Sequence, residues 1–140
     1  MTGQARRGTP ARPMLAWLPA VAWAALIFAF SAQPDLRFLP DDGIDFVVRK
    51  IGHMGVFGIL ALLTWRAVAA TSALRRPWAW AIALTVIYAI TDELHQGAVG
   101  RHASALDVVV DAIGALLVVA AVHVLRSKWG RLRGWDSLWR

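Results

Sequence analysis

The sequence contains no cysteine, one tyrosine and few charged residues. Without cysteine, disulfides, thiolate catalysis and Cys-based metal sites are excluded. Charged residues make up 17% of the 140 residues and hydrophobic residues 58%, which exceeds the roughly 45–50% apolar content of soluble domains. The mean hydropathy is +0.52. This composition predicts a one-domain membrane protein, and its eight tryptophans fit anchoring at the membrane–water interface.

Acidic residues are also scarce. The chain has nine Asp and Glu residues and fifteen Lys and Arg residues, which gives a formal net charge of +6. The basic residues fall in loops and tails and form no motif that reads nucleic acid, so we expect no nucleic-acid partner. We expect the positive charge to set membrane topology instead, with the lipid bilayer as the first partner.

Four apolar segments predict an all-α, four-helix transmembrane bundle. Runs this long and continuous must be helical, because lipid offers no partners for backbone polar groups. The third run, Trp78–Ile90, is shorter than the roughly 20 residues of a span, so we expect TDELHQ (91–96) to continue it. The expected helices cover about residues 14–33, 47–70, 77–97 and 104–125, within a membrane domain of 14–125.

The charges predict the orientation of this bundle. With four spans, eleven of the fifteen Lys and Arg residues fall on one side, so both termini are expected to be cytoplasmic. Residues 1–13 and 126–140 then form basic tails, the second containing tryptophan. Residues 34–45, rich in Pro, Gly and Asp, are expected to be an irregular extracytoplasmic loop. A cleaved signal peptide is disfavoured for the first segment, because no A-x-A site follows it.

Polar side chains gather toward the outer half of three of these helices. Lys50 and His53 share a face of the second helix, while Asp92, Glu93 and Gln96 lie on one turn of the third. The fourth carries a polar stripe at 3–4 spacing, formed by Arg101, Ser104, Asp107 and Asp111. A carboxylate at the centre of a membrane helix costs about 2.5–3.5 kcal/mol, so we expect these to face inward and pair with Lys50, Arg101 and histidines.

Two further local predictions concern packing and capping. Ser104 is expected to cap the fourth helix, because Ser-x-x-Asp before an apolar run resembles a capping box. Gly52, Gly55 and Gly58 are expected to let neighbouring helices approach the second helix closely.

Three motifs in this order resemble the VanZ-like family of small bacterial membrane proteins. They are FSAQP (30–34), RKIGHMGVFG (49–58) and YAITDELHQGAVGRHASALDVVVDAIGA (88–115), and with the four spans they cover roughly residues 14–125. The family is named for a protein linked to low-level teicoplanin resistance. The resemblance implies an envelope role in the bacterial inner or plasma membrane that affects glycopeptide susceptibility, but it supplies no reaction.

The family pattern marks twelve positions: Ser31, Gln33, Lys50, His53, Asp92, Glu93, Gln96, Arg101, Ser104, Asp107, Asp111 and Gly114. Phe57 stands where many members carry tyrosine, which removes a hydroxyl from this member.

The preferred interpretation of the polar cluster is a ligand or catalytic site open to the outer leaflet. Lys50 and Arg101 could hold the phosphate or carboxylate of a lipid-linked envelope precursor or an anionic lipid headgroup. The catalytic candidates are Asp92 or Glu93 as general base and His53 in proton transfer. The expected ligand-binding residues are Ser31, Gln33, Lys50, Gln96, Arg101, Ser104, Asp107 and Asp111.

Other interpretations stay open. The same residues could form a non-catalytic network that only stabilises the bundle or a partner complex. A metal could bind His95 with His102, or His53 with Glu93. The seven-residue spacing of His95 and His102 is no recognised ligand pattern, and we expect no metal and no cofactor. A proton or solute carrier is disfavoured, because the ionisable residues lie only in the outer half.

Overall fold

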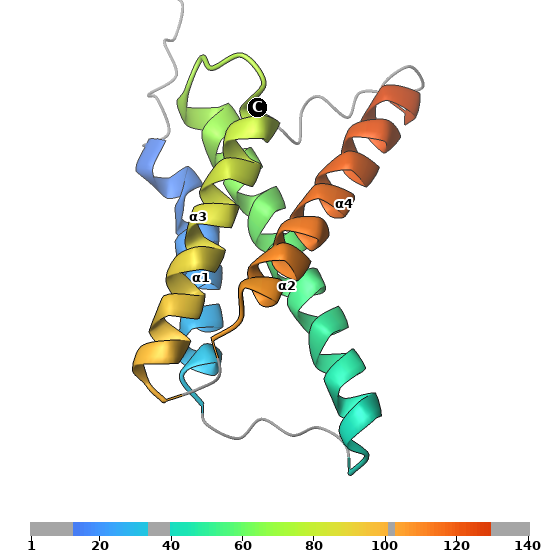
Figure 1. Cartoon of the computed structure of the whole chain (residues 1–140). Coiled ribbons are helices and arrows are strands. Elements are labelled where there is room, and N and C mark those ends of the chain that lie inside the picture. The colour runs from blue at the N-terminus through green and yellow to red at the C-terminus, as the bar shows by residue number, and fades with distance from the viewer. Residues whose placement is uncertain (1–12, 34–39, 101–102, 130–140) are drawn as a thin grey trace, which may run out of the picture.

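The computed structural model describes residues 13–33, 40–100 and 103–129, and in them four α-helices pack together (Figure 1). The all-α, four-helix prediction is thus confirmed, while most of both predicted tails, residues 34–39, Arg101 and His102 lie outside the described residues. A short 3-10 helix, η1 (Pro13–Ala16), precedes α1 (Leu18–Ser31), α2 (Asp42–Thr71), α3 (Pro77–Ala98) and α4 (Ala105–Trp129).

The first helical segment is divided at Trp17 rather than continuous from residue 14. Trp17 is the N-cap of α1, and a proline follows in its first turn. Proline has no N–H to donate and is therefore accommodated at the start of a helix, not in its interior. The helix ends at Ser31, so Gln33 lies just beyond it.

The second helix begins at Asp42 rather than near residue 47, which corrects the prediction of an irregular loop up to residue 45. The side chain of Asp41 accepts a hydrogen bond from the Ile44 N–H at 2.9 Å and caps the helix. Asp42 and Asp45 lie in the first turn, where the helix dipole favours carboxylates. These aspartates are helix-start signals.

Helices α2 and α4 cross in the middle of the molecule (Figure 1). The crossing is close because Gly114 of α4 lies against the backbone of Met54, and Gly58 of α2 lies against Val118 and the Gly114 carbonyl. The prediction of close helix approach is therefore confirmed for Gly58. It is wrong for Gly52 and Gly55, since nothing lies within 4 Å of a Cβ built at either position.

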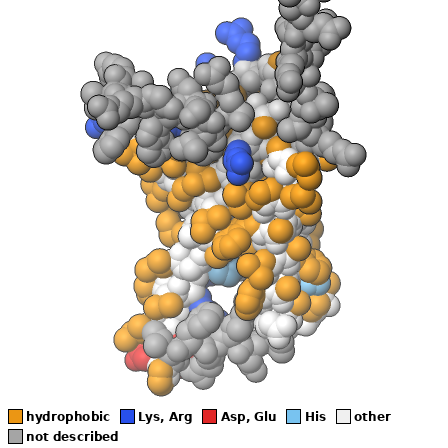
Figure 2. All heavy atoms as spheres, turned by 180° about the vertical axis from the view of Figure 1, so that it is seen from behind, with side chains coloured by type: hydrophobic (Ala, Val, Ile, Leu, Met, Phe, Trp, Pro, Cys, Tyr) orange, Lys and Arg blue, Asp and Glu red, His pale blue; other side chains and the backbone are white. Residues whose placement is uncertain are grey.

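The apolar surface is of the kind expected of an integral membrane protein. Two helical stretches are long and apolar enough to cross a membrane, Asp42–Thr71 and Ala105–Lys128, and α1 is a shorter apolar helix. Hydrophobic side chains cover the middle of the face in Figure 2. Large apolar residues such as Ile51, Leu94 and Leu106 are more than half exposed, which suits a lipid environment.

Candidate functional site

Asp92 links the end of α1 to α3. Its Oδ2 atom accepts hydrogen bonds from Ser31 Oγ at 2.9 Å and from Gln96 Nε2 at 3.0 Å. All three residues are buried, and Asp92 is only 2% exposed. The spacing of Asp92 and Gln96, one helical turn apart on α3, makes their contact possible within a single face.

Glu93, the neighbouring carboxylate, holds the start of α4 instead. Its Oε2 atom accepts a hydrogen bond from the backbone N–H of Ser104 at 2.7 Å. The Ser104 hydroxyl in turn accepts from the Leu106 N–H at 3.2 Å, so the predicted cap of α4 is confirmed. Adjacent positions on α3 thus connect to different helices, as expected for side chains about 100° apart around a helix.

Two pairs of ionisable side chains join α2 to α4 beside the crossing. Lys50 forms an ion pair and hydrogen bond with Asp107, and both side chains are partly exposed. His53 Nδ1 lies 3.3 Å from Asp111 Oδ1, and the Asp111 side chain is 1% exposed. The His53 ring is also nearly parallel to the buried Phe57, with 6.2 Å between centroids. The predicted inward pairing is confirmed for these two pairs, whereas Arg101 lies outside the described residues.

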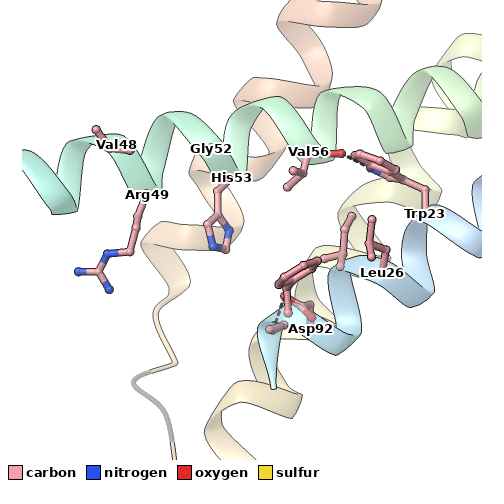
Figure 3. A pocket seen from close by; sticks show the side chains of 11 residues that line it. Trp23, Leu26, Val48, Arg49, Gly52, His53, Val56 and Asp92 are labelled. Atoms are coloured by element: carbon pink, nitrogen blue, oxygen red, sulfur yellow. Dashed lines mark hydrogen bonds between the residues drawn. The ribbon is translucent and has the colours of Figure 1, made fainter. Parts of the chain in front are cut away.

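A pocket of about 450 Å³ lies between α1 and the first half of α2. Figure 3 shows His53 projecting from α2 on the side where Asp92 lies, while the Arg49 side chain bends toward the start of α2. At one end Trp23 Nε1 donates to the Val56 carbonyl at 2.9 Å, which ties α1 to α2. The lining is mainly apolar with a few polar groups, and consists of Trp23, Leu26, Ile27, Phe30, Ser31, Val48, Arg49, Gly52, His53, Val56 and Asp92.

The pocket separates the expected site residues into two groups. Ser31, His53 and Asp92 line it. Gln33 is exposed beyond the end of α1. The remaining described candidates do not line it: Lys50, Glu93, Gln96, Ser104, Asp107 and Asp111. Of these, Gln96 and Asp111 contact the pocket residues Asp92 and His53 from behind, and the others make contacts within the bundle.

Arg49 and Trp23 are pocket residues that the sequence analysis missed. Arg49 Nε lies 3.0 Å from Asp45 Oδ2, one turn earlier on α2, while the Arg49 side chain stays 40% exposed. The signal for Arg49 was present, because Asp45, Arg49 and His53 follow i, i+4 spacing and share a face. Trp23 sits in a helix that is apolar on every side, so no sequence pattern singles it out.

The histidines differ in their surroundings. The His95 ring stacks on Phe28, with ring centroids 4.0 Å apart. His123 lies at the other end of the bundle beside Trp65 and Trp78. In the part of the chain that the structure describes, no group of three or more His, Asp or Glu side chains is arranged to hold a metal ion.

A family model described as VanZ/LLP1 matches residues 14–126, which include all four α-helices up to the last turn of α4 and every described residue of the site. The chain belongs to the VanZ/LLP1 family. The resemblance predicted from FSAQP, RKIGHMGVFG and the TDELHQ segment is therefore confirmed. No curated protein and no solved structure matches the chain. The VanZ-like residues that face the pocket come from α1, α2 and α3.

Proposed function

We propose that this VanZ-like protein binds an amphiphilic envelope molecule, a lipid or lipid-linked cell-wall precursor, in the pocket between α1 and α2. Binding there would affect susceptibility to glycopeptides such as teicoplanin. The observation that carries the proposal is the composition of the pocket. Apolar side chains of α1 and α2 form most of its lining, and Arg49, His53, Ser31 and Asp92 supply its polar groups.

The size and chemistry of the pocket support such a ligand. Its volume of about 450 Å³ lies within the range of small-molecule sites, which are mostly apolar with few polar groups. The Arg49 guanidinium presents planar donors suited to a phosphate or carboxylate. Arg49 takes the anchoring role first expected of Lys50, because Arg49 lines the pocket and Lys50 does not.

The charge distribution supports an outward-facing pocket in the inner or plasma membrane. The described basic residues away from the pocket gather where α2 and α4 end and α3 begins, and include Arg66, Arg75, Arg76, Arg126 and Lys128. These three helix ends lie at the same end of the molecule, opposite the start of α2 (Figure 1). By the positive-inside rule, the basic end faces the cytoplasm, with both termini, and the pocket faces outward.

We assign a structural role to the polar residues outside the pocket. The contacts Lys50–Asp107 and Glu93–Ser104 each join two helices. These contacts favour a non-catalytic, stabilising network for the residues outside the pocket. Ligand binding is proposed only for the residues that line the pocket. We therefore propose that Glu93 positions the start of α4.

Two glycines of α2 provide a matched test. Gly52 lines the pocket and Gly55 does not, and a Cβ at either position meets no atom within 4 Å. Gly52→Leu should therefore place its side chain in the pocket with no clash at its Cβ, while Gly55→Leu should leave the pocket open. Each variant is purified in mild detergent and its bound lipid is measured by mass spectrometry of extracts.

Protein without substitution and Gly55→Leu should retain one enriched phosphate- or carboxylate-bearing lipid, and Gly52→Leu should lose most of it. Cells carrying Gly52→Leu should also show the teicoplanin susceptibility of cells without the gene. Equal retention of the same lipid by both variants would refute the proposed binding site.

A further inference from the structure

Asp92 lines the pocket with a carboxylate that the described bundle satisfies at only one of its two oxygens. Its Oδ2 atom accepts two hydrogen bonds, from Ser31 and Gln96. Its Oδ1 atom is buried and has no hydrogen-bond partner among the described residues. Buried carboxylate oxygens are normally satisfied, so an unpartnered one that lines a pocket indicates a missing donor.

The charges around the pocket also indicate that Asp92 needs a hydrogen-bond donor from a ligand. Arg49 contacts Asp45, Lys50 contacts Asp107 and His53 contacts Asp111. Asp92, by contrast, forms hydrogen bonds among the described residues with the neutral groups of Ser31 and Gln96. A purely anionic headgroup that approached Arg49 would bring negative charge toward Asp92, which is unfavourable in a site of low dielectric constant.

Resting on the ligand binding proposed above, we infer that the ligand is a phosphate-bearing lipid whose headgroup also carries a hydrogen-bond donor. The phosphate faces Arg49 and His53, and the donor, an amine or a hydroxyl, faces Asp92 Oδ1. Ser31 and Gln96 hold the other carboxylate oxygen, so Asp92 is fixed in the orientation that presents Oδ1 to the headgroup. Asp92 is thus a specificity-determining residue.

Phospholipids that differ only in their donors test this inference without any substitution. Phosphatidylethanolamine carries an ammonium, its stepwise N-methylated forms lose one N–H at a time, and phosphatidylcholine has none. Phosphatidylglycerol supplies hydroxyls instead. Delipidated protein is mixed with equal amounts of these dioleoyl lipids, and bound species are counted by native mass spectrometry.

Phosphatidylethanolamine, phosphatidylglycerol or both should bind at least about tenfold more than phosphatidylcholine, because a hydrogen bond to a buried charge contributes about that factor. A graded loss with each methyl group identifies an amine donor. A preference for phosphatidylglycerol identifies a hydroxyl. Equal binding of all these lipids, or binding of none, overturns the inference.

The variants separate this inference from the proposed function. In Asp92→Asn the amide oxygen accepts from Ser31 and Gln96, so the NH2 group faces the headgroup and the preference for ethanolamine over choline should be lost. Glu93→Gln changes the adjacent buried carboxylate, which does not line the pocket, and should preserve the preference. If Gly52→Leu abolishes lipid binding but Asp92→Asn leaves the preference unchanged, the pocket binds lipid and the role of Asp92 is refuted. If Gly52→Leu leaves lipid binding unchanged, the proposed function itself fails.

Discussion

Gly114 of α4 lies so close to Met54 of α2 that a Cβ added at Gly114 would stand 2.6 Å from the Met54 Cα. This contact sets where the two helices cross. One turn before Gly114, Asp111 meets His53, and one turn earlier Asp107 meets Lys50. The glycine therefore determines the depth at which the charged pairs of the site form.

Substitution at this crossing should destabilise the bundle. Gly114→Ala forces a methyl group into the Met54 backbone, and overpacking of this kind costs about 1–3 kcal/mol. Gly55→Ala is the control, because open space surrounds a Cβ there and alanine is favoured in helices by about 1 kcal/mol. Thermal unfolding in detergent should show a lower midpoint for Gly114→Ala than for Gly55→Ala. Equal midpoints would contradict the close crossing.

The Lys50–Asp107 pair should be energetically coupled. In a double-mutant cycle with Lys50→Gln and Asp107→Asn, the coupling energy should be about 0.5–3 kcal/mol, as for side chains in direct contact. Arg66→Gln combined with Asp107→Asn serves as the control, since Arg66 lies near the far end of α2. The control pair should be additive, and additivity in the Lys50–Asp107 cycle would argue against the ion pair.

Glu93 should tolerate an amide better than truncation. Glutamine retains an oxygen that can accept the Ser104 N–H, so Glu93→Gln should keep most of the stability. Glu93→Ala leaves that N–H without its acceptor and should cost about 1–3 kcal/mol. The measurements are the unfolding midpoint and teicoplanin susceptibility. A Glu93→Gln variant that folds normally but loses all activity in cells would restore the general-base hypothesis.

The absence of native cysteine allows the orientation to be measured directly. Gln33→Cys, beyond the end of α1, and Ala73→Cys, between α2 and α3, each add one thiol at an exposed position. A membrane-impermeant maleimide should label the Gln33→Cys variant in intact cells and the Ala73→Cys variant only after permeabilisation. The reverse labelling pattern would place the pocket on the cytoplasmic side.

Local sequence signals account for the helices and for the pairs across the α2–α4 crossing. The 3–4 spacing that places Lys50 and His53 on one face, and Asp107 and Asp111 on another, is a property of single helices. The capping role of Asp41 was also a local signal, but the surrounding Pro, Gly and Asp favoured a loop. Tertiary context decided between the two.

The pocket could not be predicted in the same way. It exists because the first half of α2 diverges from α1 (Figure 1), and this divergence depends on how α2 crosses α4. A recess that contains histidine and basic side chains is visible on the otherwise apolar face of Figure 2. Trp23 lies at the pocket only through that arrangement, since α1 has no polar face to direct it.

The most direct test of the account is photocrosslinking from two neighbouring residues of α2. Val48 lines the pocket, whereas Val47 is 52% exposed and does not. A photoreactive amino acid is introduced at either position in cells, and the crosslinked lipids are identified by mass spectrometry. Crosslinks from position 48 should be enriched in one phosphate-bearing lipid relative to the bulk membrane and should lose that enrichment with Gly52→Leu, while position 47 should report bulk composition. Bulk composition at both positions would contradict a lipid-binding pocket between α1 and α2.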